Sequence, residues 1–242
     1  PPNNRTCPPT WSPMPVPPEL DYDAWLGPAP WAEYHEQRCH YQFRFILDYS
    51  GGQVTNFGAH HLDIVQWALG MDDSGPCRAW GRGQFPSSGL FTTATEIEAR
   101  LTYANGVEVE VRTGSSGVTF RGTAGTLSVQ RGRIVTDPPE LAEAAPGAGA
   151  IGLYRSDDHH GNWLDCIRER RQPVCPVEVG HRSATCCHLA NLAMRLGREL
   201  TWDPQGEVFV GDDEANAMLE RPGREPWASA VRSWTAAALR AG

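Results

Sequence analysis

Between residues 77 and 135 apolar and polar side chains alternate along the chain, and this period of two limits the possible folds more than any other feature. In the stretch TEIEARLTYANGVEVEV, every second residue from Ile97 to Tyr103 is apolar, and three valines continue the alternation after a turn at Asn105–Gly106. Strands with one apolar and one polar face are typical of an antiparallel sheet that is covered on one side only. The polar face then meets water, a substrate or a partner.

Segments with helical periodicity flank this region, and they occupy residues 55–70, 162–173, 181–200 and 227–242. Together with the strands they predict an α+β fold, in which an open, mainly antiparallel sheet has helices packed on one face. Residues 1–18 contain eight prolines and are expected to form an extended arm. Residues 19–242 are expected to form a single domain, and YQFRFILDYSGG within it a short strand or turn.

The composition excludes several classes of protein. A formal net charge of -8 argues against non-specific nucleic-acid binding, which needs a basic surface. No apolar run approaches the ~20 residues of a membrane span, and no targeting segment is visible. All 21 positively charged side chains are arginine, so no lysine is present for a Schiff base or a general base. We therefore expect neither a nucleic-acid partner nor a membrane partner.

The cysteines and the common catalytic motifs narrow the choice further. The seven cysteines form no C-x-x-C pair, and their odd number suits neither a disulfide framework nor a zinc ribbon. We expect most of these thiols to be buried and reduced. The sequence contains no G-x-S-x-G motif, and its Asp and Glu residues show no pairing of the kind that glycoside hydrolases use. Neither class of hydrolase is therefore indicated.

One glycine-rich segment, GAGAIG at residues 147–152, has the letters of the dinucleotide-binding fingerprint G-x-G-x-x-G. That fingerprint functions only between a strand and a helix, because the helix N-terminus holds the pyrophosphate. Here PPELAEAAP precedes the segment and LYRSDDHHGNW follows it, and both are typical of loops. The sequence therefore predicts no nucleotide-binding loop in this chain.

The stretch GGQVTNFGAHHLDIVQWALG, residues 51–70, carries the strongest functional motif. Asn56 lies four residues before His60, and Asp63 lies three residues after it, so all three are neighbours on a helix. An imidazole oriented by an amide or a carboxylate can accept and donate a proton near neutral pH. Alternatively, Asn56 only caps the helix while His60 and His61 pack beside aromatic rings. A metal site is less favoured, because consecutive helical residues diverge by ~100° and no third ligand is near.

Two further polar clusters have open interpretations. DDHHGNW, with His160, either lines a pocket beside His60 or caps the helix that follows it. GHRSAT indicates another helix start, with Ser183 or His181 near the cap. His188, within a helical pattern, is expected to be a core or interface histidine.

Several motifs occur together in a recognisable order: LDYDAWLGPAP, GGQVTNFGAHHLDIVQWALGMD, HHGNWLDCIRERRQP, EVGHRSATCCHLANLAMRLGRELTWDP and EVFVGDDEANAMLERPGREPW. In these motifs the chain resembles the Gfo/Idh/MocA oxidoreductases, especially the large bacterial branch typical of planctomycetes. The resemblance runs from about Pro17 to Trp227, which is nearly the whole chain. It implies the C-terminal α+β domain of that family, which supplies substrate contacts and oligomer interfaces.

The resemblance also assigns roles to the helix motif. The family pattern D-x-G-x-H-x-x-D falls on Asn56, Gly58, His60 and Asp63. His60 then matches the residue that accepts the hydroxyl proton of the substrate while a hydride leaves for the nicotinamide. Asn56 stands where the family usually has aspartate, and an amide can position an imidazole but cannot relay a proton.

Family members also have an N-terminal Rossmann domain that binds NAD or NADP and carries a catalytic lysine in an E-K-P motif, and this sequence shows neither. NAD or NADP is therefore expected only together with that domain, and we expect this chain alone to bind neither cofactor. Three explanations remain open. The chain is a fragment of a longer oxidoreductase, which we favour, or it pairs with a separate nucleotide-binding polypeptide, or it is a natural domain without redox chemistry.

These observations lead to two hypotheses. In the first, the chain is the substrate-binding and oligomerisation part of an NAD(P)-dependent sugar or polyol oxidoreductase, with His60 and Asn56 as catalytic residues. The expected substrate contacts are Arg44, His61, Asp63 and His160. In the second, it is a stand-alone carbohydrate-binding domain or a metal-dependent keto-sugar lyase or isomerase. We expect a homo-oligomer through the open sheet face and a cytoplasmic protein, with export as the alternative.

Overall fold

The structure is a computed structural model, and it describes residues 10–231 apart from 115, 144–146, 148–151 and 153, together with residue 233. Its centre is a five-stranded sheet with the strand order β3-β2-β1-β7-β8. The strands are β1 (Arg78–Gln84), β2 (Glu96–Thr102), β3 (Glu108–Arg112), β7 (Leu200–Asp203) and β8 (Val208–Phe209). Every pairing in this sheet is antiparallel. The predicted α+β fold with an open antiparallel sheet is therefore confirmed.

The sheet has the two faces that the alternation predicts. On β2 the side chains of Ile97 and Leu101 are buried, with exposed fractions of 4% and 0%, while Glu98 and Arg100 between them are exposed. Because side chains alternate across a strand, one face of the sheet supports the core and the other is polar.

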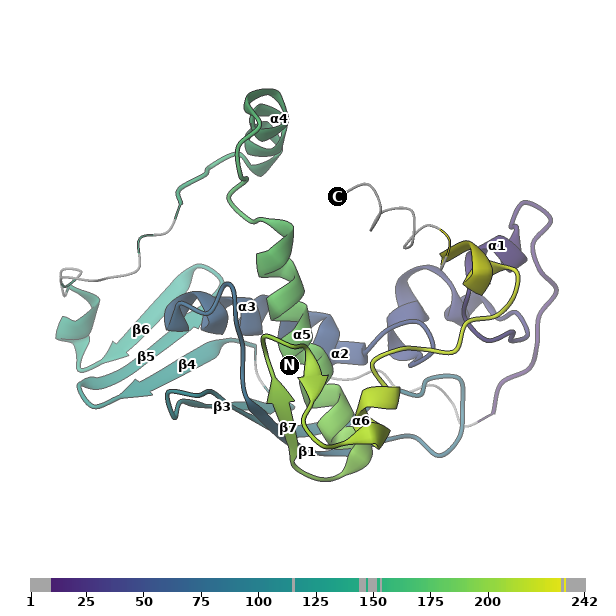
Figure 1. Cartoon of the computed structure of the whole chain (residues 1–242), viewed down its shortest axis with the longest axis horizontal. Helices are drawn as coiled ribbons and strands as arrows, with labels where there is room; N and C mark the ends of the chain where they lie inside the picture. Colours follow the sequence, from purple (N-terminus) through teal and green to yellow (C-terminus); the bar gives the residue numbers. More distant parts are fainter. Residues whose placement is uncertain are drawn as a thin grey trace.

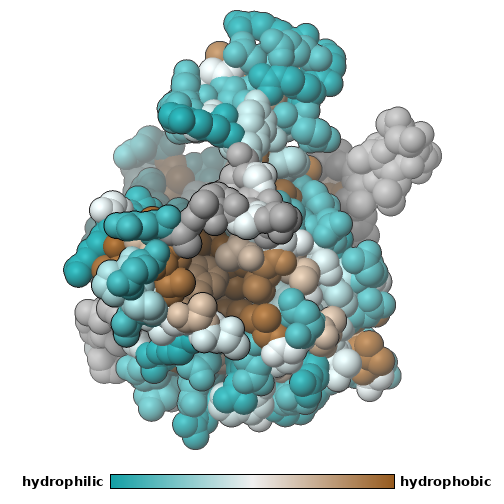
Figure 2. Space-filling model, turned by 90° about the vertical axis from the view of Figure 1, so that its left-hand side faces the viewer, coloured by the Kyte–Doolittle hydropathy of each residue, from teal (hydrophilic) through white to brown (hydrophobic). Residues whose placement is uncertain are grey.

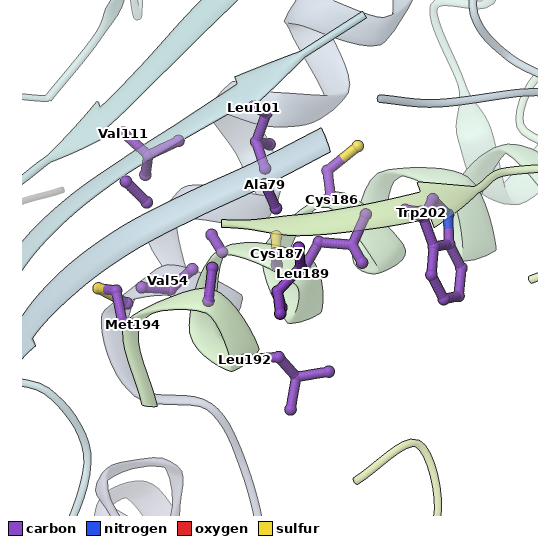
Figure 3. Close-up of a cluster of buried hydrophobic side chains, with 14 of the residues drawn as sticks. Val54, Ala79, Leu101, Val111, Cys186, Cys187, Leu189, Leu192, Met194 and Trp202 are labelled. Atoms are coloured by element: carbon purple, nitrogen blue, oxygen red, sulfur yellow. The ribbon is translucent and has the colours of Figure 1, made fainter. Parts of the chain in front are cut away.

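Helices cover the apolar face only, as Figure 1 shows for α2, α3 and α5. The helices are α2 (Gly52–Thr55), α3 (Phe57–Leu69) and α5 (Val177–Leu196). In Figure 3 side chains of α5, among them Cys187 and Met194, lie between that helix and the strands that carry Ala79 and Leu101. Burial of this apolar layer is the main stabilising contribution to the domain.

The C-terminal half contains two differences from the predicted helices. α5 begins at Val177, so Ser183 lies inside the helix instead of near its cap. Residues 227–231 and 233 are helical, and the remainder of the predicted C-terminal helix lies outside the described residues. α6 (Asp213–Ala217) follows β8. α4 (His159–Glu169) is the predicted amphipathic helix, and Figure 1 shows it standing apart from the sheet.

Three of the predicted strands form a separate sheet instead of extending the first one. They are β4 (Val118–Gly122), β5 (Gly125–Gln130) and β6 (Arg133–Asp137), which lead into the short 3₁₀ helix η3 (Pro139–Ala142). Gly114 and Gly117, both with positive φ, lie between β3 and β4 and let the chain leave the large sheet. Figure 2 looks at the side where β4–β6 lie and shows hydrophobic surface gathered in a central hollow.

The N-terminal region forms a lobe beside α2. It contains α1 (Tyr22–Leu26) and the 3₁₀ helices η1 (Glu36–Arg38) and η2 (His40–Phe45). Of the strand or turn predicted within YQFRFILDYSGG, the structure shows a turn, which follows η2. Phe45 and Ile46 are buried there in a small cluster with Leu90 and Phe91.

The proline-rich arm is described from residue 10 onward. Residues 10–17 have no regular secondary structure, as an extended arm requires. The arm is held to the lobe where the backbone N–H of Met14 donates to the carbonyl of Tyr34 at 2.9 Å. Trp11 packs edge-on against His35.

A clasp near the C-terminus holds the lobe from the other side. We use the name clasp for residues 224–227. The guanidinium of Arg224 donates to the carboxylate of Asp23 at 2.6 Å and to the carbonyl of Gly27 at 3.0 Å. The indole N–H of Trp227 donates to the same carboxylate at 3.2 Å. Segments about 200 residues apart in sequence are therefore joined by charge-assisted hydrogen bonds.

In the described part of the chain, no helix has the length and apolar character that crossing a bilayer requires.

Candidate functional site

The helix motif is interrupted at Asn56, where α2 ends and α3 begins. Asn56 occupies the N-cap position of α3, as predicted, but its side chain makes no capping hydrogen bond. Its amide nitrogen donates instead to the side-chain oxygen of Gln53 at 2.9 Å. The amide therefore links the two helices, and it does not contact the imidazole of His60 through any hydrogen bond in the described chain.

A close contact between α5 and the glycine pair at the start of α2 fixes the position of the helix motif. The side-chain amide of Asn191, on α5, donates to the carbonyl of Gly51 at 3.0 Å. A Cβ at Gly51 would lie only 2.5 Å from that amide nitrogen, so glycine is required for the contact. Gly52 has φ +69°, a conformation that glycine adopts without strain. These contacts fix α2 and the beginning of α3 against α5.

His60 lies on the outer side of α3. The opposite side of the helix carries Leu62, Val65 and Gln66, all of them buried. His60 is exposed, and so is Trp67, which lies two turns further on the same face. The imidazole packs edge-on near Phe57, with 6.2 Å between ring centroids. It is therefore presented on the open side of the helix layer, away from the sheet.

Asp63 does not orient His60, although the spacing allows it. One carboxylate oxygen accepts a hydrogen bond of 2.6 Å from the hydroxyl of Ser183, a buried residue of α5. A buried hydroxyl needs a partner, and the carboxylate of Asp63 is the one that α3 provides. Asp63 thus joins α3 to α5, and the predicted triplet Asn56–His60–Asp63 is not connected by hydrogen bonds in the described residues.

His61 is half-buried on the side of α3 that faces the smaller sheet. Its Nε2 lies 3.2 Å from the hydroxyl of Ser116, in the turn before β4. Burial lowers the pKa of His61, and the positive charges of His60 and Arg131 lower this pKa further. The ring is therefore neutral at pH 7.

The DDHHGNW cluster caps α4. One carboxylate oxygen of Asp158 accepts from the backbone N–H of His160 at 3.1 Å and of Gly161 at 3.0 Å. These hydrogen bonds lower the pKa of Asp158. His160 is exposed and lies against His159, with ring centroids 4.0 Å apart. Of the two interpretations, capping is the one that the structure shows, and α4 stands apart from α3 (Figure 1).

Arg44 belongs to the N-terminal lobe, on η2. Its guanidinium lies 3.5 Å from the ring centroid of Tyr41, which is a close cation–π contact. No hydrogen bond or ion pair in the described chain joins Arg44 to the helix motif. The predicted contacts Arg44, His61 and His160 therefore lie on three different elements.

The outer face of α5 carries side chains whose positions differ from those expected from the sequence. His188 is predicted to be a core or interface histidine; it is exposed on α5, so it does not belong to the core, and an interface position stays a prediction. The reason is rotation about the helix axis: Cys186 and Cys187 are fully buried, and His188 follows them onto the outer side. His181, His188 and Arg195 recur every seven residues, and this spacing was the signal in the sequence for one shared face.

A cavity of about 1080 Å³ lies between the N-terminal lobe and the segment around the clasp. Its walls include Trp25, Phe43, Asp48, Tyr49 and Arg221. His60 does not line it. This cavity and the candidate acid–base residue are thus separate features of the described surface. Among the described residues, no three or more His, Cys, Asp or Glu side chains gather as a metal site.

The comparison with protein families decides the relationship. Residues 8–229 match the family described as the oxidoreductase family, C-terminal alpha/beta domain, of the Gfo/Idh/MocA type. The chain belongs to this family. Its α+β fold with an antiparallel sheet is the fold of that C-terminal domain. No curated protein matches the chain significantly.

Two solved structures are similar to the chain at low sequence identity. The WlbA dehydrogenase from Bordetella pertussis, in complex with NADH and UDP-GlcNAcA, is 15% identical, with a TM-score of 0.50; the match covers 67% of this chain and 48% of that one. An NAD-binding protein from Listeria innocua is 16% identical, with a TM-score of 0.47 and coverage of 72% and 52%. The chain thus spans about half the length of the solved structures that it matches.

The described residues do not fit a dinucleotide. Binding of NAD in this type of protein uses a parallel βαβ unit with a glycine-rich loop at the start of the helix. Every strand pairing described here is antiparallel, and GAGAIG lies almost wholly outside the described residues.

Proposed function

We propose that this chain is the substrate-binding part of an NAD(P)-dependent oxidoreductase acting on a sugar or polyol, in the branch typical of planctomycetes. The observation that carries the proposal is the position of His60 within a chain of this family. His60 lies in the family's helix motif and is presented on the open side of the helix layer. The sheet lies on the other side of this helix layer, and the open side is where the proposed substrate would bind.

The proposed role of His60 is to accept and return the proton of a substrate hydroxyl. No hydrogen bond or ion pair engages its imidazole in the described chain, so either ring nitrogen is available to a ligand. An imidazole nitrogen with a free lone pair can take the proton of a hydroxyl and later return it, as a general base does. The hydride acceptor, NAD or NADP, would be supplied from outside the described residues.

Asn56 enters the proposal as a positioning residue. Its side chain holds α2 to α3 through Gln53, one turn before His60. It therefore sets where the imidazole stands, without taking part in proton transfer itself. Replacing it with the aspartate usual in the family, Asn56→Asp, tests whether the carboxylate adds a proton relay.

The predicted substrate contacts have different support. His61 adjoins His60 and is neutral, so it can donate or accept a hydrogen bond to a hydroxyl. Asp63 acts through Ser183 by holding α3 against α5. Arg44 and His160 lie on η2 and α4, and they are proposed as contacts only for a ligand that extends beyond α3.

The activity test uses His60→Gln in the oxidoreductase that joins this chain to its nucleotide-binding domain. We expect kcat to fall by about 10²–10⁴-fold with a smaller change in KM, because a general base acts in the reaction step. His159→Gln, on the exposed start of α4, is the matched control. An unchanged kcat in His60→Gln would contradict the proposed role.

A second test uses this chain alone, without a nucleotide-binding domain. We expect calorimetric titration with NAD and NADP to show no binding at low micromolar concentrations, because no parallel βαβ unit is described. Binding in that range would overturn this part of the proposal. Elemental analysis of the purified chain addresses the lyase or isomerase alternative: stoichiometric zinc or manganese that is lost in His60→Ala would favour the alternative.

A further inference from the structure

The cavity beside the N-terminal lobe has walls from two distant parts of the chain. One wall comes from residues 25–30 and 40–49, and the other comes from residues 220–231. The clasp joins them, because the backbone N–H of Arg224 donates to the carbonyl of Pro28 at 2.8 Å and its Nε donates to the carbonyl of Ala29 at 3.3 Å. The cavity of about 1080 Å³ is therefore a fixed feature of the fold, as most small-molecule sites are.

The aromatic part of the wall is held in a defined orientation. The ring of Trp25 stacks on Tyr22 with 5.9 Å between centroids, and it meets Tyr49 edge-on at 5.2 Å. The hydroxyl of Tyr49 accepts a hydrogen bond of 3.2 Å from Nη1 of Arg38, which is a buried residue. Phe43, on the same wall, is 38% exposed. A ligand that packs on Trp25 and Tyr49 therefore immobilises few side chains that were free before.

Four polar side chains share the walls of this cavity: His40, Asp48, Glu220 and Arg221. In the described chain, no hydrogen bond or ion pair engages the imidazole of His40 or the carboxylates of Asp48 and Glu220. The guanidinium of Arg221 donates to the backbone carbonyl of Asp48 at 2.8 Å, and it pairs with neither carboxylate among the described residues. The walls thus offer a ligand both hydrogen-bond donors and acceptors, from groups of both charges.

The backbone at His40 is strained. Its φ is +50°, in the left-handed region that residues with a side chain rarely adopt. His40 is the first residue of η2, and it lines the cavity. Strain of this kind persists only where the surrounding fold enforces it, and it concentrates at functional sites. This conformation therefore favours a binding site here, independently of the charges on the walls.

We propose that this cavity binds a neutral polyhydroxylated molecule, such as a sugar. The walls disfavour a charged ligand, because a cation would face Arg221 and an anion would face Asp48 and Glu220. A hydroxyl group both donates and accepts hydrogen bonds, so it can pair with a carboxylate, an imidazole or a guanidinium. The rings of Trp25 and Tyr49 provide an apolar surface for the C–H face of such a molecule.

The proposed site is separate from the helix motif. His60 does not line the cavity, so the proposal does not depend on the proposed redox function. The volume of the cavity is at the upper end of the range for small-molecule sites, so it accommodates a disaccharide as well as a monosaccharide.

Calorimetric titration of the whole chain tests the ligand class. The neutral probes are glucose, cellobiose and myo-inositol, and the charged probes are glucuronate and glucosamine in its protonated form. We expect at least one neutral probe to bind with a Kd of about 1 mM or lower, and about tenfold more tightly than either charged probe. The proposal is wrong if no neutral probe binds in this range, or if a charged probe binds as tightly.

Variants locate the site. Phe43→Ala and Glu220→Ala each remove an exposed group of the walls, and neither side chain makes a hydrogen bond in the described fold whose loss would perturb it. We expect each variant to weaken the best probe by about tenfold. Glu140→Ala, an exposed residue of η3, should leave the affinity unchanged.

His60→Gln distinguishes this cavity from the helix motif, and it should also leave the affinity unchanged. Equal binding by the wild type and both wall variants, with all proteins folded by circular dichroism, would overturn the proposal. A loss of binding in His60→Gln alone would then place the sugar at the helix motif instead.

Discussion

Gln66 shows how a single buried polar residue organises its surroundings. Its side chain is fully buried, and its Nε2 donates to the carbonyls of Met71 at 2.8 Å and Ser74 at 3.0 Å. Its Oε1 accepts a hydrogen bond of 2.6 Å from the hydroxyl of Tyr103. Burial raises the pKa of Tyr103, so this hydroxyl remains a donor at any physiological pH. The network connects the end of α3 to the loop after it and to the strand region.

The variant Tyr103→Phe tests this network. It removes the donor and leaves the Oε1 of Gln66 buried without a partner, so we expect the free energy of unfolding to fall by about 1–3 kcal/mol. Urea denaturation followed by circular dichroism measures the change. The double variant Tyr103→Phe/Gln66→Met removes both polar ends, and the cycle should show coupling between them. Additive effects of the two changes would contradict the hydrogen bond.

The helix motif shows what residue spacing predicts and what it does not. The spacing of Asn56, His60 and Asp63 indicated one helix, and α3 contains the latter two. The side-chain amide of Asn56 bonds to Gln53, and the carboxylate of Asp63 bonds to Ser183. Neither bonds to His60, because other neighbours in the fold compete with neighbours along the helix. Spacing defines which positions share a face, but the packing of α5 against α3 decides which atoms meet.

At the scale of elements, α5 can lie close to β1 because that strand carries small residues. Ala79 and Gly81 face the helix, and a Cβ at Gly81 would lie 2.7 Å from Cγ of Met194 and 2.9 Å from its backbone nitrogen. The nitrogen belongs to the helix backbone and cannot move alone. Because Gly81 has no side chain, α5 can lie this close to the sheet.

Two glycine substitutions, with opposite expected effects on the free energy of unfolding, test this contact. Gly81→Ala should lower the free energy of unfolding by about 1–3 kcal/mol, because the added methyl overpacks the interface. Gly180→Ala, within α5, has nothing within 4 Å of the added Cβ and should stabilise by about 0.5–1 kcal/mol. Thermal unfolding of both variants beside the wild type measures the pair. A stabilised Gly81→Ala would show that the helix can shift at no cost.

Periodicity predicted most of the elements, because each of them has a one-sided contact with the core. The alternation within 77–135 predicted β1 to β6, and the helical pattern around 181–200 predicted α5. It did not separate β4–β6 from the large sheet, since two sheets with similar alternation differ only in which strands pair. It also missed η2, where aromatic burial occurs without regular pairing. Strand partners are tertiary information, and a period of two does not contain them.

At the scale of the molecule, the polar face of the large sheet is a charged surface. Arg82 and Glu98 form an ion pair at 2.8 Å across β1 and β2, and Arg100 lies 3.9 Å from Glu108 on β3. Trp80, which is half-buried, lies on this face between them. Alternating charges of both signs can match the same surface on a second copy, as a two-fold interface requires.

The expected homo-oligomer should therefore respond to salt. We expect sedimentation velocity to show a dimer in 50 mM NaCl that dissociates in 0.5 M NaCl, because salt screens exposed charges. Arg100→Glu should weaken the dimer by placing like charges together, while Arg133→Glu, on β6, should not. A monomer at 100 μM protein in low salt would contradict an interface on this face.

The clasp also orders events during synthesis. Arg224 and Asp23, which it joins, are separated by 201 positions in the chain. At a translation rate of about 5–20 residues per second, the N-terminal lobe emerges roughly 10–40 s before the segment that fastens it. During that interval the carboxylate of Asp23 lacks the guanidinium and the indole N–H that bind it in the complete fold. The lobe is thus complete only after a segment made about 200 residues later has been added.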